Sequence, residues 1–415
     1  MEEVTIQKLV YGGQGLAELQ DGRKVFVWNA LPGEQVQARF IKRKRSYAEA
    51  IAEEIIEVSS ERRVPREANY LATSPWQMMV FEAENRHKTQ IIHELFAHEN
   101  VTLPDVSEIV TVGPEWHYRN KMEYSFWGDE NGLHLALYRR GSHGKQIVEG
   151  SELALPVLDR AAQAVLFELQ NIGLRAGDLK TIVVRCSQEN ETVAALYTKT
   201  DNFPKIGLPS GVKGLRVYYS DPKSPASVAT RLLCELGDTT LQDDILGKTF
   251  MYTVDSFFQV NLPVYEKALT RIREYCMGDP IDMYAGVGSI GLSVAQQQVE
   301  LVELDPTTVE MARVNAAKSG LITTVTETST EKALAHIEAT RPVVFDPPRA
   351  GLHSRVVERC LEVVPPQVIY LSCNPATQAR DLVRLQGKYK INFFEIYNFF
   401  PKTPHIETLA ILTRK

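Results

Sequence analysis

The strongest constraint on the fold is an alternation of strand-like and helical segments that begins near residue 250. The pattern runs through "PIDMYAG" and "GLSVAQQQ", "VELVELD" and "PTTVEMARVNAAKSG", then "PVVFDPPRAG", "VIYLSCNP", "KINFFEIYNFF" and "ETLAILTRK". Such alternation is typical of a parallel, doubly wound α/β sheet, which binds its ligands at the carboxyl ends of its strands. We therefore expect residues 251–415 to form a Rossmann-like domain with its chemistry at that edge.

The chain before residue 250 shows two other patterns. Residues 1–58 contain short strands of alternating apolar residues, with turns at Gly12-Gly13 and Asp21-Gly22, and predict a small OB-like β-barrel. Such barrels often bind oligonucleotides. Residues 59–250 combine many strand signals with few helices and predict a central mixed antiparallel α+β domain. A helix is expected at about 81–98, with packing on the C-terminal domain as one possible arrangement.

The composition indicates the cellular location of the protein better than its function. No apolar stretch reaches the roughly 18 residues needed to cross a bilayer, and the first residues lack a signal-peptide pattern. The cysteines are far apart and form no C-x-x-C, so neither a disulfide framework nor a metal site is expected. We expect a cytoplasmic protein without a membrane partner. The five cysteines are Cys186, Cys234, Cys276, Cys360 and Cys373.

The distribution of charge is more informative than the total. A net charge of −6 does not indicate a nucleic-acid binder. Two basic clusters, 42–45 in "FIKRKRSY" and 139–145 in "LYRRGSHGK", have the composition of phosphate-contacting surfaces. A solvated charged face explains either cluster equally well.

A glycine-rich loop follows the first strand of the C-terminal domain. Gly286, Gly288 and Gly291 match G-x-G-x-x-G, which lets backbone approach a ligand before a helix N-terminus. The next strand ends near Glu303, where a carboxylate can accept hydrogen bonds from ribose hydroxyls. These features fit NAD and S-adenosylmethionine equally, and a loop without a ligand is the third interpretation.

The segment "FDPPRAGL" indicates a nucleic-acid methyltransferase. Asp346 ends a short apolar strand, and the two following prolines remove two backbone donors and stiffen the turn. The turn is similar to the target-base loop of nucleic-acid methyltransferases. Enzymes that methylate an amino group usually have an aromatic residue after the prolines, whereas Arg349 stands here. An exocyclic amine is therefore disfavoured as the target.

Cys373 stands where the apolar run "VIYL" stops, between Ser372 and the turn-forming pair Asn374-Pro375. That position favours a nucleophile over a structural cysteine. The C5 carbon of a pyrimidine is a weak nucleophile until a thiolate adds to C6, and such covalent catalysis replaces one difficult step by two easier ones. Free cysteine has a pKa of about 8.5, so we expect nearby dipoles or cations to favour the thiolate. Arg380 is a candidate for positioning the substrate or the loop.

A base must then remove the C5 proton before the thiol can leave. The segment "FFPKTPHIETLAIL" offers His405 and Glu407 just before the last strand. Glu407 is our first choice, and His405 is the alternative.

Together these motifs resemble the RNA 5-methyluridine methyltransferase family over nearly the whole chain. The resemblance rests on a TRAM-like barrel ("GGQGLAEL", "ALPGEQVQARF") and on "RNKMEYSF", "FFQVN", "DMYAGVGSIGL", "DPPRAGL", "SCNPATQARD" and "FPKTPHIET". It implies that Cys373 is the nucleophile and Glu407 the base. It also implies that S-adenosyl-L-methionine is the cofactor and RNA the substrate, with a monomeric enzyme expected. The implied cofactor-binding residues are Gln259, Tyr284, Ser289, Glu303 and Asp346, although the family often has asparagine in place of Ser289.

One feature of many family members is missing from the chain. Those proteins hold an iron–sulfur cluster with a C-x5-C-x2-C linker after the barrel and one later cysteine. The corresponding linker reads "RVPREANYLATSPWQ", Ser151 lies near the later position, and no cysteine precedes Cys186. A cluster with thiolate ligands is therefore not expected. Apolar packing is expected to hold the linker, with Trp76 as the filling residue.

The resemblance favours a uridine over a cytosine, because cytosine-C5 enzymes place a further catalytic cysteine in the proline loop. A TRAM-like barrel is typical of the ribosomal RNA branch, so 23S rRNA is the favoured substrate and a tRNA T-loop the alternative. Two interpretations from other classes stay open. An NAD-dependent oxidoreductase explains the glycine loop and Glu303, and a non-catalytic RNA-binding protein explains the barrel and basic clusters.

Overall fold

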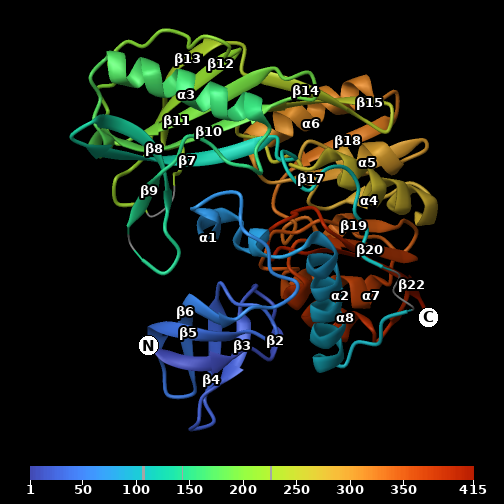
Figure 1. Ribbon diagram of the computed structural model, residues 1–415. Coiled ribbons are helices and arrows are strands. Elements are labelled where there is room, and N and C mark those ends of the chain that lie inside the picture. The colour runs from blue at the N-terminus through green and yellow to red at the C-terminus, as the bar shows by residue number, and fades with distance from the viewer. Residues whose placement is uncertain (105–107, 143, 225–226) are drawn as a thin grey trace.

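Figure 1 shows a computed structural model that describes residues 1–104, 108–142, 144–224 and 227–415. The described residues form three sheets of six, seven and seven strands and a separate two-stranded hairpin. The N-terminal barrel, in blue, lies below the central domain, in green, and the C-terminal domain, in orange and red, lies beside them. This confirms the prediction of an α/β protein with a barrel, a central mixed domain and a Rossmann-like domain.

The barrel is a curved six-stranded sheet in the order β1-β5-β6-β4-β3-β2. Alternation along the strands produces its interior, as in β5, where Val36 and Ala38 are fully buried and their neighbours are not. Glycines at the turns adopt positive φ angles, +98° at Gly12 and +97° at Gly13. The strands are β1 (Glu2–Thr5), β2 (Lys8–Leu9), β3 (Gly15–Glu18), β4 (Lys24–Trp28), β5 (Gln35–Arg43) and β6 (Tyr47–Glu57).

The central sheet has the order β13-β12-β11-β10-β7-β8-β9, and its pairs are antiparallel except for β11 and β12. Helix α3 (Pro156–Asn171) packs on β8, β10 and β11 through its apolar face. The strands are β7 (Lys121–Asp129), β8 (Gly132–Tyr138), β9 (Lys145–Ile147), β10 (Leu179–Cys186), β11 (Thr192–Thr198), β12 (Gly214–Tyr219) and β13 (Arg231–Gly237), with the short helix η2 (Ala176–Asp178) before β10.

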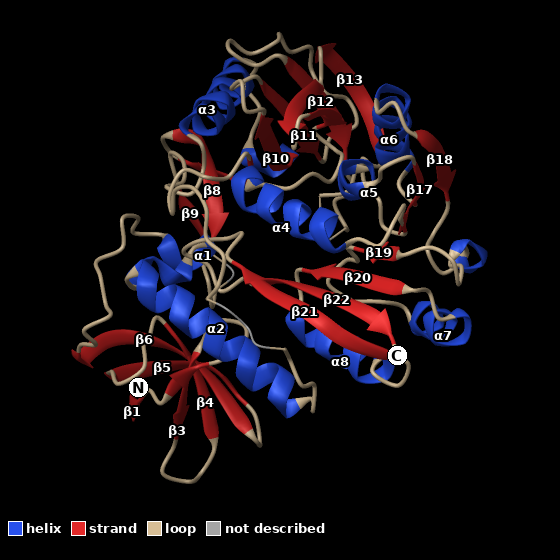
Figure 2. Ribbon diagram, turned by 90° about the vertical axis from the view of Figure 1, so that its right-hand side faces the viewer, coloured by secondary structure: helices blue, strands red, loops and turns tan. Residues whose placement is uncertain are grey.

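The segment between the barrel and the central sheet contains α1 (Tyr70–Thr73), η1 (Pro75–Met78) and α2 (Phe81–His98). Its first part contacts the central domain, where Ala72 packs on the core, whereas α2 lies against the C-terminal domain. Helix α2 packs on α8 (Pro375–Leu385), and Figure 2 shows it between the barrel and the last strands of the chain. Phe96 of α2 meets Phe394 edge to face, with ring centroids 5.0 Å apart.

The hairpin of β14 (Thr240–Ile245) and β15 (Lys248–Thr253) crosses the boundary expected at residue 250. Its backbone is tied to the C-terminal domain, since the Met251 amide donates to Asn315 Oδ1 at 2.8 Å and Asn315 Nδ2 returns a bond of 2.9 Å. We therefore propose that the C-terminal domain begins at β14.

The C-terminal sheet has the order β18-β17-β16-β19-β20-β22-β21. Successive residues of β20 enter opposite cores: Ile369 and Leu371 pack with α4, α5 and α6, whereas Val368 and Tyr370 pack with α2, α7 and α8. The strands are β16 (Ile281–Asp282), β17 (Gln298–Glu303), β18 (Ile322–Glu327), β19 (Val343–Phe345), β20 (Gln367–Ser372), β21 (Tyr389–Tyr397) and β22 (Glu407–Arg414). The remaining helices are α4 (Leu262–Tyr275), α5 (Ser289–Val294), α6 (Pro306–Lys318), η3 (Leu334–His336) and α7 (Ser354–Val363).

One strand departs from the parallel sheet that the sequence predicts. β22 lies between β20 and β21 and is antiparallel to both. The connection from Tyr397 to Glu407 contains no helix, and a parallel return would need a longer crossover. Because β22 is reversed, its first residue, Glu407, lies at the edge where the parallel strands end.

None of the described helices is both long enough and apolar enough to cross a membrane. All five cysteines are free thiols. Within the described ranges, no three His, Cys, Asp or Glu side chains are grouped as ligands for a metal ion.

Candidate active site

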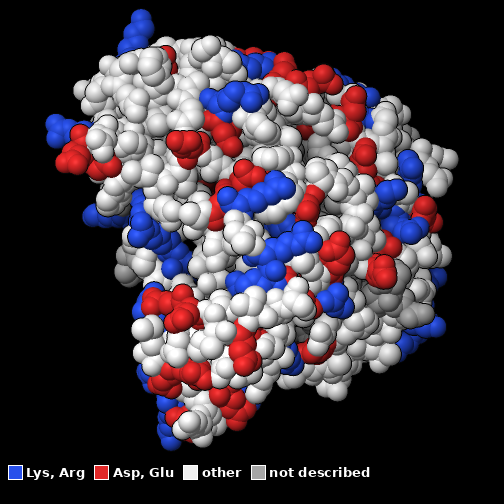
Figure 3. Space-filling model, in the orientation of Figure 1, with Lys and Arg blue, Asp and Glu red and all other residues white. Residues whose placement is uncertain are grey.

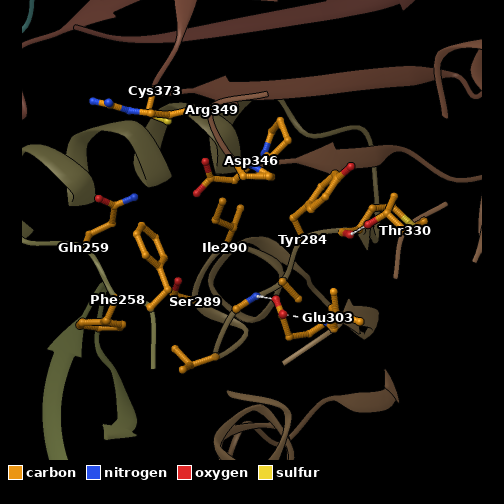
Figure 4. Close-up of a pocket in the computed structure, with 18 of the residues that line it drawn as sticks. Phe258, Gln259, Tyr284, Ser289, Ile290, Glu303, Thr330, Asp346, Arg349 and Cys373 are labelled. Carbon is orange, nitrogen blue, oxygen red and sulfur yellow. Dashed lines mark hydrogen bonds between the residues drawn. The ribbon is translucent and has the colours of Figure 1, made fainter. Parts of the chain in front are cut away.

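A cavity of about 720 Å³ lies at the carboxyl edge of the C-terminal sheet. In Figure 4, Glu303 lies toward one end of the cavity and Cys373 and Arg349 toward the other, with Asp346 and Ile290 between them. All seven site residues expected from the sequence line this cavity, and so does His405. They are Gln259, Tyr284, Ser289, Glu303, Asp346, Cys373 and Glu407.

The glycine loop forms one wall of the cavity and leads directly into α5. Gly286 and Gly288 have φ angles of +56° and +88°, which L-residues with side chains rarely adopt. A Cβ on Gly288 would lie 2.8 Å from Leu292 Cδ1. Both the backbone conformation and the helix packing therefore require glycine at Gly288.

Glu303 is held by backbone donors on both of its carboxylate oxygens. Oε2 accepts from the Gly286 amide at 2.9 Å, and Oε1 accepts from the amides of Leu304 and Asp305 at 2.7 and 2.9 Å. A carboxylate has about four acceptor positions, so these three bonds leave capacity for a hydroxyl donor. The arrangement fits a nucleoside ribose.

Two polar contacts complete the wall beside the glycine loop. The hydroxyls of Ser289 and Tyr265 lie 2.7 Å apart, so a buried tyrosine of α4 fixes the first residue of α5. Tyr284 contacts Phe345 edge to face, and burial raises the pKa of its phenol to about 12. Both tyrosines therefore stay protonated at neutral pH. The sequence motifs did not indicate Tyr265.

The central domain supports the "FFQVN" segment that carries Gln259. The buried Arg185 of β10 donates to the carbonyls of Ser256 and Phe258 at 2.7 and 2.6 Å, and Asn120 Nδ2 donates to the Gln259 carbonyl at 3.1 Å. Phe257, between these anchored residues, is 64% exposed and lines the cavity. An exposed aromatic ring at the mouth of a cavity is a candidate for stacking on a base.

Cys373 and Glu407 are brought together by strand pairing. Ser372 of β20 pairs with Thr408 of β22, so Cys373, one residue later, and Glu407, one residue earlier, lie next to each other. The pKa of each side chain responds to charge on other groups of the cavity: Glu407 and Asp346 raise that of Cys373, and Asp346 raises that of Glu407. A thiol, a buried carboxyl and a second acid therefore share one enclosed space.

The electrostatic environment of Cys373 differs from the one expected from the sequence. The sequence predicts surroundings that favour the thiolate, but burial, then Glu407 and Asp346, raise the pKa of Cys373 to about 12, and Arg349 only partly opposes them. Burial also raises the pKa of Glu407 well above its ordinary value, and burial and Asp282 raise that of Asp346 to about 7. The cavity in this state therefore holds a thiol, and its surroundings disfavour the ionised form of Glu407.

Arg349 is a cation of this half of the cavity, which Arg119 also lines. Its Nη2 lies 3.0 Å from His405 Nδ1, and burial followed by the charge of Arg349 lowers the pKa of His405 to about 4. His405 is thus a neutral acceptor that orients Arg349, and it is a poor base at neutral pH. Arg380 donates to the carbonyls of Ala350 and Leu352 at 3.1 and 3.4 Å, so it positions the loop after the prolines.

The linker that lacks cysteines is held by apolar packing, as expected, since Trp76, Met78 and Met79 are buried in one apolar cluster. Hydrogen bonds add to this packing. Gln77 Oε1 accepts from the amides of Arg66 and Glu67 at 3.1 and 3.3 Å, and Glu67 Oε1 accepts from the Glu152 amide at 2.9 Å. Trp76 is fully buried, and its indole Nε1 donates to the Gly13 carbonyl at 3.0 Å. The tryptophan therefore joins the linker to the barrel.

The basic clusters are partly occupied by internal contacts. Arg140 stacks 3.9 Å over the Trp28 ring and donates to the Leu71 carbonyl, and Lys145 donates to the Phe126 carbonyl at 3.0 Å. In the 42–45 cluster, Lys42 and Arg43 pair with glutamates of the barrel. Figure 3 shows Lys and Arg side chains gathered across the middle of one face, and mostly Asp and Glu on the barrel below.

Comparisons with known proteins agree with this geometry. Residues 231–415 match the tRNA (Uracil-5-)-methyltransferase family model, and residues 1–52 match the TRAM domain model. A protein of Lactiplantibacillus plantarum named an uncharacterized RNA methyltransferase is 31% identical over 100% of this chain and 97% of its own length. A protein of Enterococcus faecalis with the same name is 30% identical over 99% and 97%.

A solved structure shares the whole fold. The tRNA (uracil-54, C5)-methyltransferase of Pyrococcus abyssi, crystallised with S-adenosyl-L-homocysteine, superposes with a TM-score of 0.80 at 21% identity, over 99% of this chain and 100% of that one. Fold, cavity and relatives together define an RNA methyltransferase. The chain belongs to the RNA uracil-5 methyltransferase family, whose methyl donor is S-adenosyl-L-methionine.

Proposed function

We propose that this enzyme methylates C5 of a uridine in structured RNA through a covalent bond between Cys373 and C6 of the base. The supporting observation is the register of β20 and β22, which brings Cys373 and Glu407 together at the cavity. Uracil is the favoured ring because the turn "DPPR" contains no second cysteine.

The residues present fit S-adenosyl-L-methionine. Glu303 is fixed to accept from ribose hydroxyls, the glycine turn gives close backbone approach, and Tyr284 and Ile290 supply an aromatic and an apolar wall. Gln259, Ser289 and Asp346 are proposed as the remaining contacts. When bound, this cofactor supplies a methyl group on a positively charged sulfur, ready for attack by a carbon nucleophile.

The chain's own residues would carry the steps on the base. Once the thiol proton has left, the Cys373 sulfur bonds to C6 and the C5–C6 electron pair moves toward O4, which makes C5 nucleophilic. After C5 has gained the methyl group, the Glu407 carboxylate removes the C5 proton, the C5–C6 double bond re-forms and the sulfur leaves as thiolate. Burial disfavours the ionised forms of Cys373 and Glu407, which the reaction requires, and the charge of Arg349 favours both of them.

The target base would reach Cys373 by leaving its stack. Phe257, exposed at the cavity, offers an aromatic face to the displaced base or to its neighbour. Ribosomal RNA is the proposed substrate because the match to a TRAM domain at residues 1–52 agrees with the branch that the sequence resembles. A tRNA is the alternative, as the similar Pyrococcus abyssi enzyme acts on tRNA. The free cysteines fit a reducing cytoplasm.

The decisive experiment is incubation with S-adenosyl-L-methionine and 5-fluorouridine-substituted 23S rRNA or tRNA fragments. Fluorine at C5 cannot leave as a proton, so a covalent protein–RNA adduct should accumulate and survive denaturing electrophoresis. Cys373→Ala should abolish the adduct, and Cys234→Ala, a matched change at a distant cysteine, should leave it intact. An adduct that survives Cys373→Ala, or its absence from the wild type with both RNAs, contradicts the mechanism.

Two further assays on the same purified protein distinguish the proposed function from its rivals. An NAD-dependent oxidoreductase should show a fluorescence change with NADH and none with S-adenosyl-L-homocysteine. A non-catalytic RNA-binding protein should bind RNA without transferring a radiolabelled methyl group. Product RNA containing 5-methyluridine excludes both alternatives.

A further inference from the structure

The barrel touches the candidate active site through the loop between β2 and β3. The hydroxyl of Tyr11, in this loop, donates to Asn374 Oδ1 at 2.7 Å. Asn374 directly follows Cys373 and is the N-cap residue of α8. These partners lie 363 positions apart in the chain.

The Asn374 side chain joins three elements. Its Oδ1 accepts from Tyr11 and from the Ala376 amide, the latter at 3.2 Å, and its Nδ2 donates to the Arg349 carbonyl at 2.7 Å. The same amide thus connects the barrel, the start of α8 and the turn after the two prolines. The nucleophile and the nearby cation are both adjacent to this junction.

The Tyr11 hydroxyl is suited to act only as a donor to Asn374. Burial raises the pKa of Tyr11 to about 12, and Arg349, Cys373 and Glu407 are all near enough to act on it through charge. The ring is still 39% exposed. Tyr11 therefore borders the reacting groups and lies open to an approaching substrate.

Two further contacts hold the loop in this place. Gly13 has a φ angle of +97°, and a Cβ there would lie 2.4 Å from Pro404 Cβ, so only glycine allows this approach. Trp76 connects both sides, since Nε1 donates to the Gly13 carbonyl at 3.0 Å and its amide donates to the Lys402 carbonyl at 3.1 Å. The loop is thus seated on the segment that leads to Glu407.

The barrel is poorly suited to hold RNA by charge alone. Residues 1–58 contain eight Lys and Arg against nine Asp and Glu. Six of the eight cations form ion pairs with carboxylates, which leaves Lys44 and Arg45. Because paired cations release fewer counterions from RNA, we expect the barrel to act at the site more than through phosphate contacts.

We propose that Tyr11 is a positioning residue for methylation: through Asn374 it fixes the turn that carries Cys373 and the backbone of Arg349. This inference rests on the proposed function and extends it to a residue of the barrel. Without the hydroxyl, the Asn374 amide loses one of its anchors, and the sulfur and guanidinium spend less time in the reactive arrangement. The loss should fall on the rate of reaction with bound RNA.

The test compares full-length wild type, Tyr11→Phe and Tyr47→Phe under steady-state conditions with unsubstituted RNA. Tyr47 is the matched control, a barrel tyrosine whose ring contacts Phe26 and whose hydroxyl has no recorded hydrogen bond among the described residues. Tyr11→Phe should lower kcat about tenfold with less than a twofold change in the KM for RNA, and Tyr47→Phe should change neither. Affinity for S-adenosyl-L-homocysteine and the Tm should be unchanged.

A double-mutant cycle with Asn374→Ala tests whether Tyr11 acts through Asn374. If Tyr11 acts through Asn374, adding Tyr11→Phe to Asn374→Ala should lower kcat no further. An unchanged kcat for Tyr11→Phe, a change in KM alone, or fully additive losses would each overturn the inference while leaving the proposed function intact. A wild type that forms neither product nor adduct would overturn both.

Discussion

The two halves of the cavity are built differently. On the cofactor side, Glu303 accepts three backbone hydrogen bonds, and Ser289 is bonded to Tyr265. On the base side, within the described part of the chain, no hydrogen bond reaches the carboxyl of Glu407, and Cys373 is held as a thiol. One half is preorganised before ligand binding, whereas the surroundings of the other disfavour the ionised groups that the reaction needs.

The difference shows what each half requires. A nucleoside is recognised by fixed acceptors and backbone, which can be satisfied before it arrives. A reactive thiolate and a carboxylate are costly to bury without a partner, and burial here raises the pKa of both groups. Arg349 is the neighbouring charge that opposes this effect on both.

The largest expected effect comes from a substitution on the base side of the cavity. Glu407→Gln removes the base but keeps the size of the side chain, so turnover of ordinary RNA should fall by about 10²–10⁴-fold. Methyl transfer to C5 should still occur, and the covalent adduct should therefore accumulate. Quantifying adduct and free product on denaturing gels checks this. Normal turnover by Glu407→Gln would show that another group acts as the base.

The reactivity of Cys373 in the free protein tests the neutral state of the base side. With a pKa of about 12, the thiol should react with iodoacetamide at pH 8 roughly 50-fold more slowly than an unstructured cysteine peptide. Its rate should keep rising between pH 8 and 10, where that of the peptide levels off. Peptide mass spectrometry measures the alkylation. A rate that levels off near pH 8 would show that the thiolate is already favoured.

A smaller effect is expected on the cofactor side. Glu303→Ala should weaken binding of S-adenosyl-L-homocysteine about tenfold or more, because it removes the anchored acceptor. Alkylation of Cys373 should not change, since the two halves are held by different contacts. Calorimetry measures the affinity, and Glu310→Ala, at an exposed position on α6, is the control. A parallel change in Cys373 reactivity would show that the halves are coupled.

The smallest effect concerns Asp282, buried beneath the glycine loop, where its Oδ2 accepts from the Gly291 amide at 2.8 Å. Burial, with a contribution from Glu303, raises its pKa to about 7, so the folded protein retains a proton that the unfolded chain loses above about pH 4. Stability should therefore decrease as pH rises from about 4 to 7. Asp282→Asn cannot ionise, and its Tm should fall by about 3 °C less than that of wild type between pH 5 and 8. Calorimetric scans at both pH values check this difference, and parallel curves for the two proteins would contradict it.

The sequence was most informative where local chemistry decides the structure. The glycine spacing, Glu303 after the second strand, and the Asp346 and Cys373 turns each occur within a few residues of a strand end, so alternation alone brings them to one edge. Five of the seven expected residues line the cavity for this reason. Gln259 reaches it from the segment before α4, and Glu407 reaches it through the reversal of β22. Tyr265 had no such signal, because a tyrosine within an amphipathic helix has the pattern of a core residue.

Other features depend on contacts between distant segments. An apolar strand has the same pattern in either direction, so the reversal of β22 was not predictable. Packing of the helix at about 81–98 on the C-terminal domain was one arrangement considered from the sequence, and α2 packs on α8. The raised pKa of Cys373 arises from burial and from Glu407 and Asp346, which tertiary structure brings together. The bond from Tyr11 to Asn374 joins two ends of the sequence that carry no shared pattern.

The position of β22 in the sheet also determines what happens to the active site if this strand detaches. This strand lies between β20 and β21, which both precede it in the chain. It can therefore join the sheet only after these two strands have left space for it. Should β22 detach transiently, the proton acceptor would move away from the sulfur in the same event. Because burial and Glu407 both raise the pKa of Cys373, a partially opened molecule would present a more reactive thiol without its base, and sheet closure would act as a safeguard against unwanted bonds to cellular RNA.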